Sequence, residues 1–360
     1  MFRFFSAPDG NAAAGLSDVD LGAAAPPGEG ALVETPPADI PTRPTMVDEA
    51  TRSGRGRPTI GLALGGGAAR GFAHIGVLRT LIKHGLEFDV IAGSSVGAMA
   101  GGCYASGHLD AFEEWARSLT RRRVFGYLDF NLSGSGLIGG ARLAERLDAT
   151  LGDTAINELS VRFAAIATEI GTGHEIWLTR GRLADALRAS FSLPGVFAPV
   201  RVGGRWLMDG ALVNPVPVSA ARALGARMVV AVNLNADLIG RGSTIAAHGT
   251  DDDDEKVIEV AAPRGGFRAM FGAERAIKRQ FLGQGGRPGF STVMMEAFNI
   301  MQDRITRARL AGDPPDVTIS PRLGGVGLLD FDRAAESIAL GAEAAERALD
   351  MIGESIAALA

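Results

Sequence analysis

Residues 59–71 of the chain read TIGLALGGGAARG, a short apolar run that ends in three consecutive glycines. An apolar run of this length that stops at glycine is typical of a buried strand leading into a tight turn. Apolar residues at helical spacing follow between Phe72 and Ile82. The stretch therefore predicts a strand, a glycine turn and a helix, which together begin a strand–helix–strand unit.

A second strand and helix follow directly. Residues 88–92 (FDVIA) predict the strand, and the small residues from Val96 to Ala105 predict the helix. Strand, helix, strand and helix at this spacing indicate a parallel sheet built from right-handed crossovers, and so an α/β fold. Further strands are predicted at 162–170, 175–179, 198–202, 205–208 (after a hairpin turn at Gly203-Gly204), 228–233 and 317–320, and a long helix at 332–359.

The composition excludes several classes of protein. The formal net charge of the 360 residues is −5, which gives no global attraction to nucleic acid. Cys103 is the single cysteine, so the chain has no intramolecular disulfide and no cysteine cluster for a metal. We therefore expect neither a nucleic-acid partner nor a metal or other cofactor.

Two segments do not follow the pattern of a folded domain. Residues 1–57 hold seven of the 17 prolines without hydrophobic periodicity, which predicts a disordered tail before one domain at 58–360. Residues 236–292 contain an acidic run and many glycines, and we interpret them as an insertion or mobile connection. No run approaches the ~18 apolar residues of a membrane span. We expect a cytoplasmic protein that meets lipid peripherally, at the inner membrane surface.

Residues 93–97 read GSSVG and are the most informative five residues for function. G-x-S-x-G between a strand and a helix is the context of a nucleophile elbow, in which Gly93 and Gly97 allow the turn and Ser95 projects its hydroxyl. The alternative is a plain strand-to-helix turn with Ser94 or Ser95 as a helix cap.

Gly65, Gly66 and Gly67 lie between the first strand and its helix. Backbone N–H groups of consecutive glycines can converge into an anion-binding nest, which in an acyl hydrolase would hold an oxyanion. A nucleotide site is the rival interpretation. However, the spacing up to Gly71 is one residue longer than the dinucleotide fingerprint, and no G-K-[ST] follows. Close packing of helix on sheet is the third explanation for these glycines.

The base that would activate Ser95 is best sought among carboxylates. A triad histidine on an α/β-hydrolase fold comes last in chain order, and only His248 follows Asp209, within the irregular segment. Asp209 ends the strand predicted at 205–208 and is followed by Gly210, so it is either the base or an ordinary turn aspartate. The other four histidines are explained by helix or loop positions: His74, His84, His108 and His174.

Three of these motifs together resemble the patatin-like phospholipases, most closely the bacterial subgroup. The resemblance rests on 61–78, 93–97 and 209–211, and the SLPG and NPVP runs at 192–195 and 214–217 also look like family blocks. Residues 316–320 and 328–331 extend it towards the C-terminus.

The resemblance implies a three-layer α/β/α fold with a mostly parallel central sheet. It also implies a Ser95–Asp209 dyad and an oxyanion hole from the backbone of Gly65, Gly66 and Gly67, with Arg70 supporting that loop. Ala211 stands where many members have a second glycine, a departure that leaves the dyad intact.

The expected function is hydrolysis of lipid acyl esters by a serine acyl hydrolase that needs no cofactor. One alternative is a non-catalytic regulator on the same fold that binds lipid or acyl groups, and another is a nucleotide-binding protein. The motifs do not encode the lipid, its head group or the oligomeric state. Residues 267–282 resemble a basic interfacial helix, although packing of this helix on its own domain explains the pattern equally well.

Overall fold

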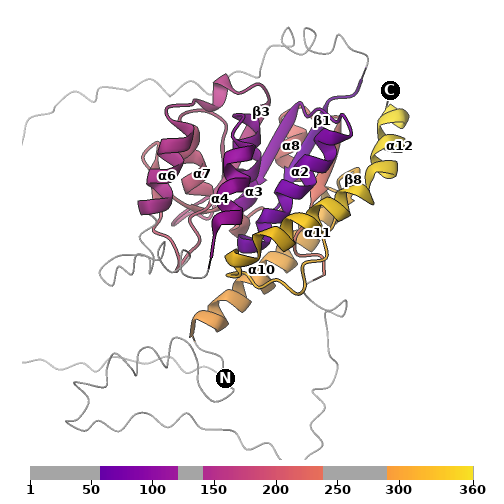
Figure 1. Cartoon of the computed structure of the whole chain (residues 1–360). Coiled ribbons are helices and arrows are strands. Elements are labelled where there is room, and N and C mark those ends of the chain that lie inside the picture. Colours follow the sequence, from indigo (N-terminus) through magenta and orange to yellow (C-terminus); the bar gives the residue numbers. More distant parts are fainter. Residues whose placement is uncertain (1–56, 121–140, 238–289, 360) are drawn as a thin grey trace, which may run out of the picture. The chain divides into compact units, whose positions relative to one another are not determined.

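The computed structural model describes residues 57–120, 141–237 and 290–359, which belong to one compact unit, Thr51–Ala360 (Figure 1). The tail predicted at 1–57 and the segment predicted at 236–292 fall outside these ranges except at their ends. So do His248 and the helix predicted at 267–282. These predictions stay untested. Among the described helices, none combines the length and apolarity that crossing a membrane would require.

The described residues form one sheet in the order β5-β6-β3-β2-β1-β7-β8, with β4 paired to β3. Strands β3, β2, β1, β7 and β8 pair in parallel, β4 and β6 each pair antiparallel with β3, and β5 pairs antiparallel with β6. The bounds are β1 (Ile60–Leu64), β2 (Val90–Ser94), β3 (Arg162–Glu169), β4 (Glu175–Leu178), β5 (Val200–Val202), β6 (Arg205–Asp209), β7 (Met228–Val232) and β8 (Val317–Ile319).

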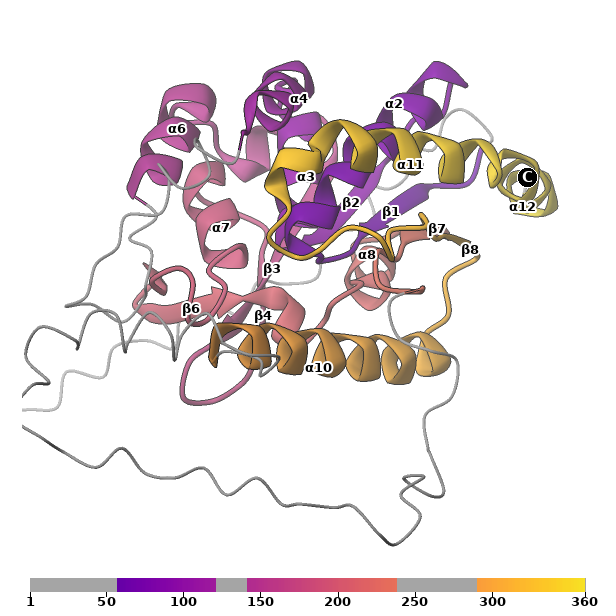
Figure 2. The same ribbon diagram turned by 60° about the horizontal axis from the view of Figure 1, so that its bottom comes forward.

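Helices cover both faces of this sheet (Figure 2). The helices are α2 (Ala73–Lys83), α3 (Val96–Ala105), α4 (Leu109–Ser118), α6 (Ala141–Leu151), α7 (Leu183–Ser190), α8 (Val218–Ala223), α10 (Phe290–Gly312), α11 (Ala334–Glu346) and α12 (Leu349–Leu359). Short 3-10 helices are η1 (Ala68–Phe72), η2 (Ile156–Glu158), η3 (Gly210–Leu212) and η5 (Phe331–Arg333).

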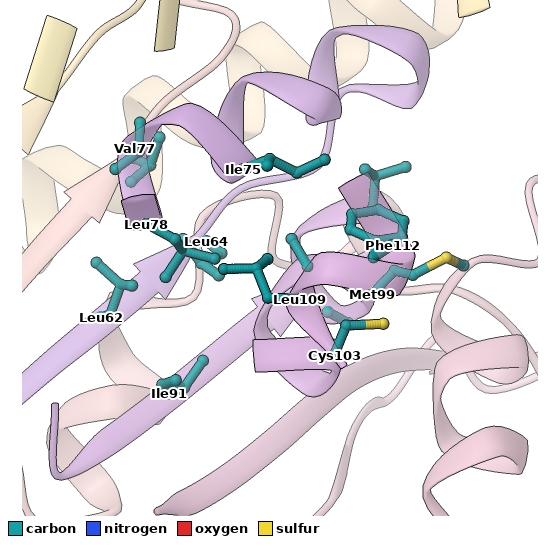
Figure 3. Packing of buried hydrophobic residues seen from close by; sticks show 14 of the residues in the cluster. Leu62, Leu64, Ile75, Val77, Leu78, Ile91, Met99, Cys103, Leu109 and Phe112 are labelled. Carbon is teal, nitrogen blue, oxygen red and sulfur yellow. The ribbon is translucent and has the colours of Figure 1, made fainter. Parts of the chain in front are cut away.

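The alternation of side chains along the strands produces two separate apolar layers. Leu62, Leu64 and Ile91 face the layer that holds α2, α3, α4, α7 and α11, and Figure 3 shows them against side chains of α2 and α3. Ala63 and Ala92 face the opposite layer, where α8 packs. The three-layer α/β/α fold with a mostly parallel sheet is therefore confirmed.

The predicted strands agree with the structure to within about two residues, and the hairpin is confirmed. Gly203 and Gly204 have φ of 56° and 82° between the antiparallel strands β5 and β6, a turn that favours glycine.

The single helix predicted at 332–359 is wrong. The chain instead forms η5, then α11, then α12, with a break at Arg347 and Ala348. The Ala348 N–H bonds back three residues to the Ala345 carbonyl, and the turn this makes lets Ile352 of α12 pack into the core.

Candidate active site

Ser95 lies at the tight turn between β2 and α3. Its backbone has φ 56° and ψ −126°, and Ala68 is the other non-glycine residue in the described ranges with positive φ. A non-glycine residue keeps such a conformation only where its surroundings enforce it, and such positions cluster at functional sites. Ser95 therefore has the backbone of a nucleophile elbow.

The two glycines of GSSVG are required by close backbone contacts. A Cβ at Gly93 would lie 2.5 Å from the Ala98 nitrogen, and a Cβ at Gly97 would lie 2.2 Å from the Leu64 carbonyl oxygen. Both neighbours are backbone atoms, which cannot move aside as a flexible side chain could. The glycines thus let α3 begin directly against the ends of β1 and β2.

The register of β3 brings Asp209 next to Ser95. Ala167 is paired with Asp209 on β6, immediately after Ile166, which is paired with Ser94 on β2. Strand β4 pairs with one edge of β3, and both β2 and β6 pair with the other edge. Strand β6 therefore continues along the edge of β3 from the point where β2 ends. Two residues separated by 114 positions therefore meet at one point of the sheet.

The Ser95 hydroxyl donates a hydrogen bond to the Asp209 carboxylate, with 2.6 Å between Oγ and Oδ2. Ser95 is 5% exposed and Asp209 1% exposed. The other carboxylate oxygen accepts the Ala211 N–H at 2.8 Å. The Asp209 backbone is also held, because its N–H donates to the Ser192 carbonyl and its carbonyl accepts from Thr168 Oγ1. The carboxylate is thus fixed in the orientation in which it faces Ser95.

Burial raises the pKa of Asp209 to about 7, and the hydrogen bonds from Ser95 and Ala211 oppose that rise. A carboxyl group that titrates near neutrality can both accept and return a proton at physiological pH. This property suits a general base and is unusual for a turn aspartate.

The glycine loop is more constrained than the sequence suggests. The Gly65 N–H donates to the Val232 carbonyl at 3.1 Å and the Gly66 N–H to the Pro215 carbonyl at 2.9 Å. Within the described ranges, the Gly67 N–H has no acceptor. The expected convergence of three N–H groups is therefore corrected, because two of them anchor the loop to neighbouring segments and only the third has no acceptor within the described ranges.

The loop also lies directly beside the serine. A Cβ at Gly66 would lie 3.5 Å from the Ser95 Cβ and 2.8 Å from the Ala211 Cβ. Gly71, later in the same run, is needed because a Cβ there would lie 2.0 Å from Val96 Cγ1 at the start of α3. Gly71 is thus required by the packing of η1 on α3, a contact between two helices rather than the predicted packing of helix on sheet.

The comparisons with known proteins agree with this geometry. Residues 62–222 match the family model described as patatin-like phospholipase. An uncharacterized NTE family protein of Mycobacterium tuberculosis is 33% identical over 334 residues, covering 82% of this chain and 93% of that relative. The chain belongs to the patatin-like phospholipase family.

More distant relatives share the patatin-like region within longer proteins. A second NTE family protein of Mycobacterium tuberculosis is 28% identical over 298 residues, 81% of this chain and 46% of that protein. Patatin-like phospholipase domain-containing protein 7 of Rattus norvegicus is 32% identical over 198 residues, 52% of this chain and 15% of that protein. The predicted resemblance is confirmed, and it makes the chain a member of a lipid acyl hydrolase family.

His74 of α2 holds the glycine loop of this patatin-like domain in place through a hydrogen bond. Its ring is fully buried, and Nε2 lies 2.7 Å from the Gly65 carbonyl oxygen. Burial lowers the pKa of His74 to about 4, so the ring is neutral and donates its Nε2–H to that carbonyl. His74, which the sequence places in a helix, is therefore a buried polar residue of α2.

Arg70 extends this support to the C-terminal half of the chain. Its Nε donates to the Val326 carbonyl at 2.7 Å and its Nη1 to Asn299 Oδ1 of α10 at 3.3 Å. The side chain therefore ties η1, which follows the glycine loop, to α10 and to the loop before η5.

Sequence reasoning missed the polar side chains that α10 brings over the site. The Gln302 amide nitrogen would lie 3.6 Å from a Cβ on Gly66, and Gln302 Oε1 accepts from Asn235 Nδ2 at 3.3 Å. That bond orients the amide with its NH2 group towards the glycine loop. Ser190 was missed as well, although its Oγ accepts the Ser95 N–H at 3.0 Å.

A cavity of about 270 Å³ lies between α8 and the C-terminal half of α10, and Ser95 is not part of its lining. Its lining includes Asn214, Ser219 and Arg309. Among the described residues, no group of three or more His, Cys, Asp or Glu side chains could hold a metal ion. The catalytic hypothesis thus rests on the elbow and its hydrogen bonds, and not on an open cavity.

Proposed function

We propose that the chain is a serine hydrolase that cleaves lipid acyl esters, with Ser95 as nucleophile and Asp209 as general base. The observation that carries the proposal is the 2.6 Å hydrogen bond between a buried serine on a strained elbow and a carboxyl whose pKa is about 7. A purely structural role explains neither the strained backbone of Ser95 nor the burial of the Asp209 carboxyl, whereas a catalytic role explains both.

The first half of the reaction forms an acyl-enzyme. Asp209 accepts the Ser95 proton as Oγ attacks the ester carbonyl carbon, and the carbonyl oxygen becomes an oxyanion. The alcohol then leaves and takes the proton back from Asp209. In the second half, water attacks the acyl-enzyme while Asp209 accepts its proton, which returns to Ser95 as the carboxylic acid departs.

The oxyanion needs at least two backbone donors. Gly67 supplies one, because Gly65 and Gly66 already donate to carbonyl groups. Val96 supplies the other: it is the first residue of α3, where N–H groups have no intrahelical acceptor. The N–H of the residue after the nucleophile and an N–H from a separate loop form the oxyanion hole of α/β-hydrolases.

The hydrogen bonds of the Gly65 and Gly66 N–H groups disfavour the alternative interpretation of the loop as a nucleotide site. A phosphate nest requires several free N–H groups in succession, whereas two of these three are occupied. A non-catalytic regulator on the same fold remains the second candidate from the sequence, and it predicts a protein that binds acyl lipids without turnover.

Release of fatty acid from phospholipid and neutral-lipid esters tests the proposal. Ser95→Ala and Asp209→Asn are each expected to reduce turnover roughly 10³-fold or more while the protein stays folded. The matched control is Ser94→Ala, which removes a buried hydroxyl with no hydrogen-bond partner one residue away. If folded Ser95→Ala turned over esters at the rate of the wild type, the proposal would be wrong.

A further inference from the structure

Helix α10 has the opposite polarity to an ordinary surface helix. Four of its polar side chains are buried: Asn299, Gln302, Asp303 and Thr306. Four large apolar side chains on the other side are roughly half exposed: Val293 (50%), Met294 (46%), Ile300 (49%) and Met301 (47%). A helix that packs on its own domain normally turns the apolar side inward.

The exposed apolar residues form one stripe. Ile300 follows Val293 by seven residues and Met301 follows Met294 by seven, so each pair lies two turns apart on the same side of the helix. We call Val293, Met294, Ile300 and Met301 the outer face of α10. A contiguous apolar patch of this kind marks a surface that meets a partner or a lipid phase.

The inner side of α10 is fixed by the active site, so the helix cannot rotate to bury its outer face. Asn299 accepts from Arg70, and Gln302 accepts from Asn235 beside the glycine loop. Phe298 packs against Leu193 and Ala211, next to Asp209. The same helix therefore contacts the site with one side and exposes the apolar stripe on the other. Figure 2 shows α10 on the outside of the domain, beside β4 and α8.

Basic residues continue the stripe along the helix. Arg304 and Arg307 are exposed and lie four and seven residues after Ile300, on the same side. The helix carries three arginines against two acidic residues, whereas the whole chain has a net charge of −5. Arg307 pairs with Asp303 at 2.9 Å and Arg309 pairs with Glu175 at 2.8 Å, and the exposed Glu296 lies between Val293 and Ile300. The local positive charge is therefore small, and salt screens it beyond about 8 Å at physiological ionic strength, so docking depends mainly on the apolar residues. An apolar stripe bordered by arginines suits a membrane surface with anionic head groups.

We infer that the outer face of α10 is the surface by which the protein docks on an anionic lipid bilayer. Docking there brings the bilayer against the helix whose other side covers Ser95 and Asp209. The inference rests on the proposed function, since a lipid surface is chosen as the partner because the site would act on lipid esters.

Vesicle sedimentation with the full-length Ser95→Ala protein tests docking separately from turnover. The parent is expected to bind vesicles of phosphatidylcholine with phosphatidylglycerol more tightly than pure phosphatidylcholine vesicles. In the same background, Ile300→Glu with Met301→Glu is expected to weaken binding at least tenfold. Met351→Glu is the matched control, because Met351 of α12 is equally exposed, at 50%, and should leave binding unchanged.

A fluorescence measurement covers the case in which the double variant fails to fold. Cys103 is buried and its pKa is raised to about 12, so an environment-sensitive dye would label only an introduced cysteine. The dye at Met301→Cys should shift to the blue on vesicles, and the dye at Met351→Cys should not.

Three results would overturn the inference: a parent that binds neither vesicle, a folded double variant that binds as the parent does, or a dye at position 301 that does not respond. A parent dimer that the double variant dissociates, without vesicle binding, would instead identify a second copy of the chain as the partner. These binding readouts do not depend on ester hydrolysis, because the Ser95→Ala parent lacks the proposed nucleophile. Failure of the proposed function and failure of docking are therefore distinguishable.

Discussion

At the scale of single residues, the site depends on one buried carboxyl group and its protonation. In the proposed mechanism, the hydroxyl of Ser95 passes its proton to Asp209, which requires that this carboxyl be ionised, and burial holds its pKa near 7. The hydrogen bonds from Ser95 and Ala211 keep the pKa from rising further. The reactivity of the serine is therefore tied to pH in the neutral range.

Hydrolysis of a water-soluble acyl ester should depend on pH in the direction set by this group. Below pH 7 we expect kcat/KM to rise about tenfold per pH unit, and above pH 7 to level off, since the ionised base is then fully present. The measurement is the kcat/KM profile from pH 5 to 9 with a substrate that does not itself titrate. A flat profile across this range would remove Asp209 as the base.

The same shift predicts that Asp209 destabilises the folded protein at neutral pH. Between about pH 4 and 7 the unfolded chain has lost the Asp209 proton while the folded chain retains it. Stability therefore falls as pH rises through this window and stays lower above it.

Asp209→Asn removes this dependence and can keep both contacts, because its oxygen can accept from Ala211 and its amide can donate to Ser95. The variant should be more stable than the wild type at pH 8, by at most ~4 kcal/mol, with the difference vanishing near pH 4. Thermal unfolding of both proteins at several pH values measures the effect. A wild type that is the more stable at pH 8 would contradict it.

At the scale of helices and strands, close backbone contacts explain where glycine is required. Gly97 lets α3 begin against the end of β1, and Gly76 lets α2 cross α11, where a Cβ would lie 1.9 Å from the Ile338 carbonyl oxygen. Neither contact could be predicted from the sequence, because each joins segments that are far apart in the chain.

Substitution of Gly97 by alanine should be costly in stability, because the clash is with the Leu64 backbone. We expect a loss of ~2–4 kcal/mol in the free energy of unfolding. Gly353→Ala in α12 is the matched control: nothing lies within 4 Å of its added Cβ, so the better helix propensity should stabilise by about 0.5–1 kcal/mol. Chemical denaturation of both variants tests the pair, and equal stabilities would refute the explanation.

The sequence predicted the strands well and α10 not at all. The strands are apolar runs bounded by glycine and turn residues, a pattern that burial on both faces of a parallel sheet requires. In α10 the apolar residues recur at helical spacing, but the buried side is mostly polar, so the pattern alone would have turned the wrong side of this helix inward. The glycine loop shows the same limit, since the carbonyls that occupy Gly65 and Gly66 come from Val232 and Pro215.

The two residues of the proposed dyad could be chosen from the sequence, but their meeting could not be derived from it. It depends on β6 taking the edge of β3 just beyond the end of β2, which is a matter of register. The resemblance to a known family, and not periodicity, connected Ser95 with Asp209 before the structure did.

At the scale of the whole molecule, the patatin-like region is completed by elements beyond residues 62–222. Strand β7 pairs with β1 and supplies the carbonyl that anchors Gly65. Helix α11 packs on α2 so closely that Gly76 and Gly341 meet backbone atoms of the opposite helix. The C-terminal elements are thus part of the folded core around the site.

Deletion of residues 334–360 should therefore abolish cooperative unfolding, because it uncovers the apolar side of α2. Differential scanning calorimetry of the truncated chain measures this. Deletion of residues 1–50, which lie within the tail predicted from sequence to be disordered at 1–57, is the control and should leave the transition in place. An unchanged transition in the C-terminal truncation would show that α11 and α12 are dispensable.

The most direct test of the central claim is labelling with a fluorophosphonate ester, followed by mass spectrometry to locate the modified residue. We expect a single adduct on Ser95 of the wild type, slower labelling of Asp209→Asn, and no adduct on Ser95→Ala. An adduct on another serine, or equal labelling of folded Ser95→Ala, would contradict the assignment of Ser95 as the nucleophile.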